Sequence, residues 1–228
     1  MSAAEIRRAG ILGGGVIGAG WAARLVENGV AVSLFDPDPE AERRVGAVLA
    51  NADRAYAKLT MAARGERAPV AFAGSVAEAV AGADIVIEAV PERLDLKRAV
   101  YAQAEAAAGA DVLICSSTSG ILPSELQAEM ARPERLLVAH PFNPVYLLPL
   151  VEIVPGAQTA GDAPERAAAI LSGWGMHPLI LRKEIEAFVA DRLMEALWRE
   201  ALWLVRDGIA TTGEIDDAIR YGCGLRWA

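Results

Sequence analysis

Short apolar runs alternate along the chain with longer segments in which apolar residues recur at helical spacing. A short run bounded by turn residues is typical of a strand, and apolar positions at i, i+3, i+4 and i+7 are typical of an amphipathic helix. Strands are expected near residues 7–12, 31–36, 70–73, 84–90, 112–116, 135–140, 149–154 and 178–182, and helices near 16–28, 38–62, 75–81, 94–107, 123–131 and 163–174. This alternation predicts β-α-β units that build a parallel sheet, and therefore an α/β fold.

Local signals refine this outline. The run DIVIEAV at 84–90 is apolar on both faces, which predicts an interior strand of a parallel sheet. Asp162 with Glu165, and Thr211 with Glu214, match the capping box that starts a helix. We therefore expect helices to begin at Asp162 and at Thr211.

The alternation stops after Lys183. The segment EIEAFVADRLMEALWREALWLVRDG, residues 184–208, has apolar residues on a helical period and ends at Gly208, so we expect one long helix. These patterns predict an α/β domain over residues 1–183 and the start of an all-helical domain over residues 184–228. The helical domain is expected to be incomplete, because few residues follow the boundary.

The sequence GILGGGVIGAG joins the first expected strand to the first helix and places Gly13, Gly15 and Gly18 in a G-x-G-x-x-G spacing. A lone motif of this kind is a weak signal, but here it has the strand-turn-helix context of a dinucleotide site. The first glycine permits the tight turn, the second lets a pyrophosphate approach, and the third allows the helix to pack on the strand. The anion then lies at a helix N-terminus, whose N–H groups favour negative charge. The motif predicts a Rossmann-type doubly wound sheet.

Asp36 ends the second expected strand, in the sequence LFD. A carboxylate at this point accepts hydrogen bonds from both ribose hydroxyls and repels a 2′-phosphate, so the predicted cofactor is NAD and not NADP. The alternative is that Asp36 only begins the turn over residues 36–39.

The charge balance excludes several kinds of partner. Thirty acidic against 22 basic residues give a net charge of −8 with no basic run, so no nucleic-acid partner is expected. No stretch reaches the about 20 apolar residues of a membrane span, and the N-terminus lacks the apolar core of a signal peptide. Cys115 and Cys223 match neither a metal spacing nor a disulfide framework, so we expect no metal and a reducing, cytoplasmic location.

The stretch HPFNPVYLLPLVE begins at His140 and ends at Glu152. One ends an expected strand and the other lies in the next, so we expect the two side chains to meet across adjacent strands. A secondary alcohol releases hydride only if its hydroxyl proton is also removed, and a neutral imidazole titrates in the range for that step. Glu152 would orient the ring and raise its basicity. The alternative is a structural histidine at a strand end, although His177 is the better candidate for that role.

Four hydroxyl side chains follow the fifth expected strand, in the sequence SSTSGILPSEL. The carboxyl ends of strands are where open α/β sheets hold their ligands. Three of the four are expected only to serve the turn before the helix that begins near Pro123. The four are Ser116, Ser117, Thr118 and Ser119.

Five separated motifs resemble the 3-hydroxyacyl-CoA dehydrogenase superfamily in their order and spacing, and the resemblance covers nearly the whole chain. They are GGGVIGAG, IEAVPERLDLK, SSTSG, HPFNPVYLLPLVE and KEIEAFVADR. The resemblance implies that His140 is the general base with Glu152 as its partner. It also implies that Ser119 donates a hydrogen bond to the substrate oxygen that changes oxidation state.

The same resemblance assigns three residues to the cofactor. Glu92 and Lys97, in PERLDLK, match the acid and the lysine that contact the cofactor in this superfamily. Asn143 lies in the turn after the histidine and is expected to shape the nicotinamide end. The resemblance also implies a homodimer when the helical domain is complete.

Four stretches are similar to the bacterial enzymes of this superfamily that oxidise L-carnitine to 3-dehydrocarnitine with NAD; they are STSG, HPFNPVYLLPLVE, EALWREALWLVRDGIATT and IDDAIRYGCGLRWA. The acyl-CoA enzymes have an asparagine where this chain has Asp191, and a carboxylate suits a cationic substrate. Aromatic faces bind trimethylammonium groups, and Phe142 and Tyr146 are candidates for this contact, as are Trp198 and Trp203. Core packing explains these aromatic residues equally well.

Two other functions stay open. Relatives with the same His–Glu pair oxidise 3-hydroxyacyl-CoA or a sugar acid such as L-gulonate, and the basic residues of the helix expected at 38–62 would suit CoA. A non-catalytic NAD-binding sensor or structural protein is the other alternative. The intact His140, Glu152 and Ser119 argue against it.

Overall fold

The computed structural model describes residues 6–59 and 66–227 and divides the chain into two compact units, Met1–Glu186 and Ala187–Ala228. The domain boundary expected from the sequence falls after Lys183, just before this division. The last residues of the helix expected at 38–62 lie outside the described residues.

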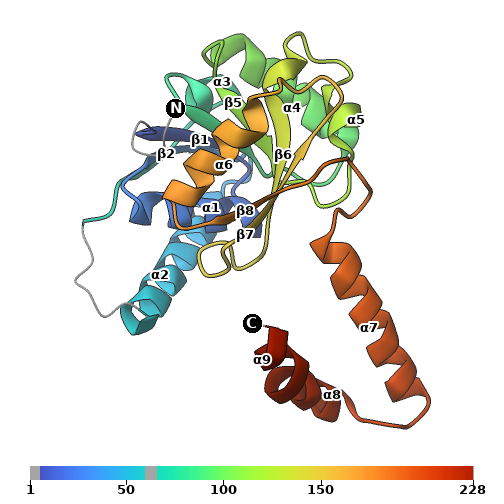
Figure 1. The fold of residues 1–228 in the computed structure, drawn as a ribbon. Helices are drawn as coiled ribbons and strands as arrows, with labels where there is room; N and C mark the ends of the chain where they lie inside the picture. The colour runs from blue at the N-terminus through green and yellow to red at the C-terminus, as the bar shows by residue number, and fades with distance from the viewer. Residues whose placement is uncertain (1–5, 60–65, 228) are drawn as a thin grey trace. The chain divides into compact units, whose positions relative to one another are not determined.

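The first unit is built on one eight-stranded sheet with the order β3-β2-β1-β4-β5-β6-β7-β8 (Figure 1). Neighbouring strands are parallel except for β6 and β7. The strands are β1 (Arg8–Leu12), β2 (Ala31–Phe35), β3 (Val70–Phe72), β4 (Ile85–Glu88), β5 (Leu113–Ser116), β6 (Leu136–Pro141), β7 (Leu150–Pro155) and β8 (His177–Ile180).

The expectation of a purely parallel sheet is wrong at β6 and β7. A parallel pair needs a crossover of about a dozen residues or more, and the connection over 142–149 is too short for one. The two strands therefore form an antiparallel pair, with His140 directly opposite Glu152. The expectation of an interior strand at 84–90 is confirmed, because β4 lies between β1 and β5 and is buried throughout.

Helices cover both faces of the sheet (Figure 1). One face carries α1 and α6. Trp21 of α1 and Trp174, which directly follows α6, are buried and belong to a single hydrophobic cluster with the strands. The other face carries α3, α4 and α5, where α4 contacts both α3 and α5. The helices of this unit are α1 (Val16–Glu27), α2 (Ala41–Leu59), α3 (Val76–Val80), α4 (Leu94–Ala107), α5 (Pro123–Gln127), the 3₁₀ turn η2 (Pro133–Arg135) and α6 (Ala163–Gly173).

Two helix predictions in this unit need correction. Asp162 precedes α6, but its backbone is in the helical region and its side chain caps no N–H, so the expected capping box is absent. An N-cap normally needs an extended backbone to aim its side chain at the first turn. The helix expected at 123–131 ends at Gln127, because the Glu105 carboxylate accepts the backbone N–H groups of Ala131 and Arg132.

The second unit is helical and consists of α7 (Ala190–Arg206), α8 (Thr212–Ala218), the π-helical turn η3 (Ile219–Cys223) and α9 (Gly224–Trp227). The capping box at Thr211 and Glu214 is confirmed, with both reciprocal hydrogen bonds present. Gly208 ends the long helix with φ +67°, as expected. The helix does not begin at 184, however, because Ala187 and Phe188 have positive φ angles of 58° and 47°. No helix within residues 6–59 and 66–227 is long and apolar enough to cross a membrane.

Candidate active site

The glycine-rich turn joins β1 to α1, and two of its three motif glycines are required by the close packing of the chain. Gly13 has φ +102°, and a Cβ at Gly18 would lie 1.9 Å from the Gly13 carbonyl oxygen. Gly15 differs, because a Cβ there would meet no atom within 4 Å. The second glycine therefore leaves open space beside the start of α1, whose first turn carries no acidic residue. This is the arrangement that a pyrophosphate needs.

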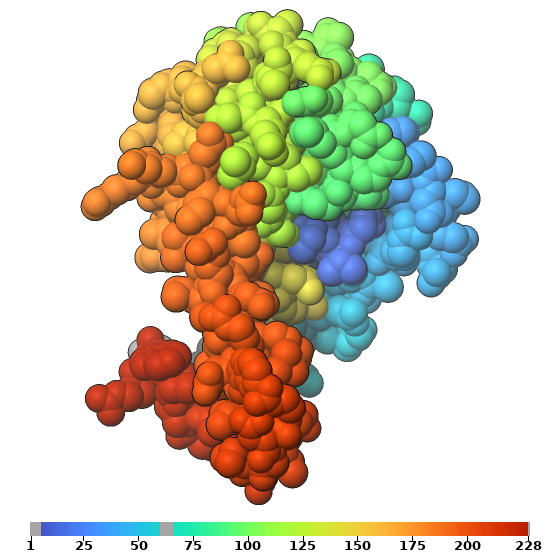
Figure 2. All heavy atoms as spheres, turned by 90° about the vertical axis from the view of Figure 1, so that its right-hand side faces the viewer, coloured from blue at the N-terminus to red at the C-terminus, as the bar shows by residue number. Residues whose placement is uncertain are grey.

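A cleft of about 900 Å³ opens beside this turn. Figure 2 faces it: the dark blue atoms of the early residues lie recessed between the lighter blue atoms that follow β2 and the green atoms that follow β4. Its size is within the range of small-molecule and cofactor sites. It is lined by Leu12, Gly13, Gly15, Val16, Ile17, Phe35, Asp36, Pro37, Asp38, Arg44, Val76, Ala89, Val90, Pro91, Leu96, Val100 and Gln103.

Asp36 lies in the wall of this cleft directly after β2. One carboxylate oxygen accepts the Gly14 backbone N–H at 2.6 Å, and the other accepts the Asp38 backbone N–H at 2.9 Å. Asp36 thus ties the glycine turn to the turn after β2. The structure places it where the sequence predicted a ribose-binding acid, and it also begins a turn, so the two interpretations are compatible.

The cleft lies at the point where the strand order reverses. The chain leaves β1 toward β2 on one side, whereas β4 pairs with β1 on the other side. Open α/β sheets bind their ligands at such a switch point, beyond the carboxyl ends of the strands. Because β1, β4, β5 and β6 are parallel neighbours, the loops after them meet at this same edge.

A buried polar cluster lies under the loops after β4 and β5. Glu88, the last residue of β4, is fully buried and accepts the Lys97 ammonium at 2.6 Å, the Ser116 hydroxyl at 2.7 Å and the Val90 backbone N–H at 2.8 Å. The Tyr101 hydroxyl also donates to Glu88. Burial, together with the neighbouring Glu88 carboxylate, raises the pKa of Tyr101 well above its usual value, so the phenol stays a donor.

Glu92 holds the loop that follows β5. Its carboxylate accepts the Thr118 hydroxyl and the backbone N–H groups of Ser119 at 3.1 Å and Gly120 at 3.2 Å. Partial burial acts to raise the pKa of Glu92, but hydrogen bonding from Thr118 and the charge of Lys97 outweigh it and lower the pKa. Glu92 is therefore an ionised anchor for this loop.

Lys97 is almost fully buried, with 1% of its side chain exposed. Its ammonium contacts Glu88, the Val90 carbonyl oxygen and, at 3.3 Å, Glu92. Neither Lys97 nor Glu92 lines the cleft. Their predicted contact with the cofactor stays a prediction.

Three of the four hydroxyl residues after β5 turn into the protein. The Ser116 hydroxyl donates to Glu88, the Ser117 hydroxyl accepts the Trp21 indole N–H at 3.1 Å, and the Thr118 hydroxyl donates to Glu92. None of them caps α5. Ser119 is the exposed member of the four, at the edge where a substrate could reach its hydroxyl.

His140 lies near the end of β6 and Glu152 lies on β7, and both side chains are buried. Their antiparallel register places the His140 Nδ1 atom 3.0 Å from Glu152 Oε2. A carboxylate at this distance favours the tautomer that carries its proton on Nδ1. The Nε2 atom of that tautomer has a lone pair and can accept a proton.

The other residues predicted for the substrate and the nicotinamide lie around His140 or farther along the chain. The Phe142 ring meets the His140 ring edge-on at 5.5 Å between centroids. Asn143 is exposed in the connection between β6 and β7, and Tyr146 packs edge-on against Tyr56 at 6.3 Å. Asp191 lies in the first turn of α7, in the second unit.

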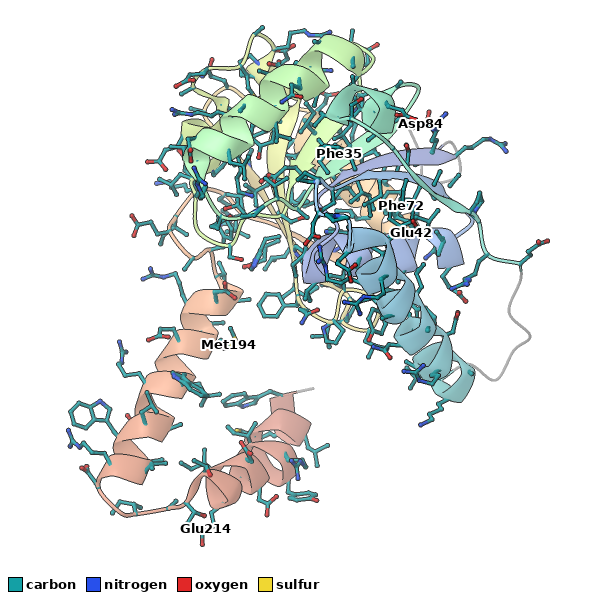
Figure 3. The ribbon with its side chains drawn as sticks, turned by 180° about the vertical axis from the view of Figure 1, so that it is seen from behind. Phe35, Glu42, Phe72, Asp84, Met194 and Glu214 are labelled. Carbon is teal, nitrogen blue, oxygen red and sulfur yellow. The ribbon has the colours of Figure 1, made fainter. Side chains whose placement is uncertain are left out.

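Sequence reasoning missed Glu88 and Tyr101 as members of the polar cluster. The signal that could have revealed Glu88 is a lone acid at the end of the apolar run DIVIEAV. A second groove of about 520 Å³ lies between α2 and β3, where Figure 3 labels Glu42 and Phe72, and none of the predicted site residues lines it. Within the described part of the chain, no group of three His, Cys, Asp or Glu residues could hold a metal ion.

The doubly wound sheet, its glycine turn and the acid after β2 together define a dinucleotide-binding protein of the Rossmann class. Family models make this specific. The model described as 3-hydroxyacyl-CoA dehydrogenase, NAD binding domain, matches residues 8–185, and the C-terminal domain model of that family matches residues 188–228. The chain belongs to the 3-hydroxyacyl-CoA dehydrogenase family, as the resemblance indicated, and its first unit is an NAD-binding domain.

Individual relatives narrow the resemblance. The chain is 58% identical to L-carnitine dehydrogenase of Mesorhizobium japonicum over 224 residues. The aligned region covers 98% of this chain and 62% of that protein. It is 55% identical to L-carnitine dehydrogenase of Pseudomonas aeruginosa, over 98% of this chain and 70% of that protein. Among solved structures, an NAD⁺-dependent dismutase, 5-formyl-3-hydroxy-2-methylpyridine 4-carboxylic acid 5-dehydrogenase, superimposes with a TM-score of 0.89 at 34% identity, over 97% of this chain and 72% of that one. The chain thus spans less than two thirds of the Mesorhizobium relative's length.

Proposed function

We propose that the protein oxidises the 3-hydroxyl of L-carnitine to a ketone, giving 3-dehydrocarnitine, with NAD as hydride acceptor. The observation that carries the proposal is the 58% identity to a named L-carnitine dehydrogenase over 98% of this chain. The His140–Glu152 pair supports it, because it offers a positioned base near the carboxyl end of β6. The residues fit NAD, since Gly15 leaves open space where a pyrophosphate would lie.

In this proposal the protein's own groups handle the proton and the alignment. Bound NAD would supply the acceptor for the hydride. His140 Nε2 accepts the proton of the carnitine hydroxyl, while Glu152 holds the ring through Nδ1 and stabilises the imidazolium that forms. Ser119 donates a hydrogen bond to the same substrate oxygen. Glu92 fixes the Ser119 backbone N–H and so sets where that hydroxyl lies.

The charge of carnitine suggests roles for three further residues. A trimethylammonium group is attracted to aromatic faces and to nearby negative charge. Phe142 lies against His140 and so is close to the proposed base, and Tyr146 lies in the same connection. We assign Phe142 and Tyr146 to the cationic end of the substrate, and we keep Asp191 as a substrate residue suggested by the sequence alone. Asn143 is assigned to the nicotinamide end, and Glu92 and Lys97 are assigned to contacts with the cofactor.

The test is NADH formation, followed by absorbance, with L-carnitine, D-carnitine, L-gulonate and 3-hydroxybutyryl-CoA in parallel. The full-length Pseudomonas relative serves as a positive control for the assay. We expect turnover of L-carnitine alone. Turnover of the CoA ester or of L-gulonate instead would refute the substrate, and NADH binding without any turnover would favour the non-catalytic alternative.

His140→Gln and Glu152→Gln separate the chemistry from cofactor binding. Loss of a general base lowers kcat by about 10²- to 10⁴-fold. We expect His140→Gln to lose turnover to this extent with NADH affinity unchanged, and Glu152→Gln to lose less. Retained turnover in His140→Gln would remove this residue from the role of base.

Two broader features also belong to the proposal. We place the protein in the cytoplasm, as expected for a chain whose Cys115 and Cys223 are free thiols.

We also propose a homodimer that involves the helical unit. Its support is the exposed apolar surface of α7, which includes Leu193, Met194, Leu197, Trp198, Leu202 and Trp203.

A further inference from the structure

The wall of the NAD cleft beyond Asp36 carries two more charged residues. Asp38 lies in the turn after β2 and Arg44 lies in the first turn of α2, and both line the cleft. Arg44 Nη1 lies 2.7 Å from Asp38 Oδ2 in a half-exposed ion pair. The other Asp38 oxygen accepts the Glu40 backbone N–H at 2.9 Å, which fixes the carboxylate in the turn.

The charges of this wall form a connected set. The Asp38 backbone N–H donates to Asp36, so the predicted ribose-binding acid and the ion pair belong to one turn. The Glu40 N–H and the Arg44 guanidinium hold the pKa of Asp38 below its usual range. Asp38, followed by Asp36 and Glu40 at longer range, raises the pKa of Arg44. Arg44 therefore lies within the field of the acid that is expected to bind the ribose.

This position matters because NAD and NADP differ only in a phosphate on the ribose 2′-oxygen. An acid at the end of β2 repels that phosphate, whereas a nearby arginine accommodates it. This chain has both types of residue in one wall. We propose that Asp38 is a second determinant of NAD specificity, because it engages Arg44 and adds its own negative charge, so that no uncompensated guanidinium faces a 2′-phosphate.

The test uses Asp38→Asn, which keeps an oxygen acceptor for the Glu40 N–H and removes the charge. An exposed ion pair contributes little to stability, so the variant is expected to stay folded. NADH and NADPH are titrated separately by nucleotide fluorescence, with thermal unfolding as a check. We expect NADPH to bind about tenfold more tightly than to the wild type, since a hydrogen bond to a charged group contributes at least this much. NADH affinity should change by less than about twofold, because its ribose carries no phosphate for Arg44 to bind.

Two further variants isolate the cause. Glu40→Gln removes the charge from a neighbouring pair, in which Arg43 Nε lies 2.7 Å from Glu40 but neither residue lines the cleft. This control should leave both affinities unchanged. In Asp38→Asn with Arg44→Ala, the gain in NADPH affinity should disappear.

Three results would overturn the proposal. They are an unchanged NADPH affinity in Asp38→Asn, an equal gain in Glu40→Gln, and a gain that survives Arg44→Ala. The measurement is of binding and requires no turnover. Failure of the specificity proposal is therefore distinguishable from failure of the proposed carnitine oxidation.

Discussion

Replacing Lys97 by Met should destabilise the first unit, because it leaves the buried Glu88 carboxylate without its cationic partner. The ammonium and the carboxylate lie 2.6 Å apart, with side chains that are 1% and 0% exposed. Methionine is similar in length and adapts to irregular space, so the variant removes the charge with little change in packing. The destabilisation would then report the unpaired charge and not a cavity.

The structure sets the size of this effect. Removing one partner of a buried ion pair costs about 3–5 kcal/mol. Glu88 would keep three donors, namely the Val90 N–H and the hydroxyls of Tyr101 and Ser116. We therefore expect a loss of free energy of unfolding at the lower end, about 3 kcal/mol. For a chain of this length each kcal/mol lowers Tm by about 2–4 °C, so Tm should fall by about 6–12 °C.

The assay is thermal and urea unfolding followed by circular dichroism. Lys97→Met combined with Glu88→Gln should recover part of the loss, because the uncompensated charge is then gone. Arg93→Met is the matched control on the same segment, since Arg93 and Asp95 form an ion pair with side chains 66% and 70% exposed. This control should leave Tm nearly unchanged. An unchanged Tm for Lys97→Met, or a double variant no more stable than that single one, would refute the reasoning.

Three other substitutions or reactions test the site and its support. Asp36→Ala should weaken NADH binding by about ten- to a hundredfold, because hydrogen bonds to a charged group are lost. The difference between the affinities for NADH and NADPH, measured by fluorescence titration, should become smaller. Unchanged affinities would contradict a ribose contact. Gly18→Ala places a methyl group against the Gly13 carbonyl oxygen and should cost about 1–3 kcal/mol in unfolding free energy, with weaker NADH binding, and wild-type stability would contradict this packing. Burial raises the pKa of the Cys115 thiol to about 12. At neutral pH an alkylating reagent that needs the thiolate should therefore modify the partly exposed Cys223 first. Mass spectrometry that finds Cys115 modified in the folded protein would contradict its burial.

Patterns that act over short distances along the chain predicted most of the fold. Each of the eight expected strands and six expected helices of the first unit is present, because alternating apolar runs report burial directly. The glycine turn was predicted for the same reason, since its spacing reflects contacts within one strand-turn-helix segment. The Thr211 capping box likewise depends on residues within one helical turn.

Features that depend on contacts between distant segments were not predicted. The helix that begins at Pro123 ends early because Glu105, on α4, competes for the N–H groups that would continue it. Phe188 has a positive φ angle and a side chain with no exposed surface. In the sequence a buried apolar residue outside a helix looks the same as one on the apolar face of a helix, so the pattern could not show that the helix begins later. The contacts of Glu88 come from α4 and β5, so an acid at the end of one strand did not reveal the cluster.

The antiparallel strand β7 explains how two polar residues, and not one, reach the ligand edge of the sheet from this region. In a parallel sheet only the carboxyl end of each strand meets that edge, which is the position of His140 on β6. Because β7 runs the opposite way, its first residues begin at this edge and deliver Glu152 opposite His140. A slip of one residue would turn Glu152 to the other face of the sheet. The short connection over 142–149 thus fixes both the direction of β7 and the register on which the proposed base depends.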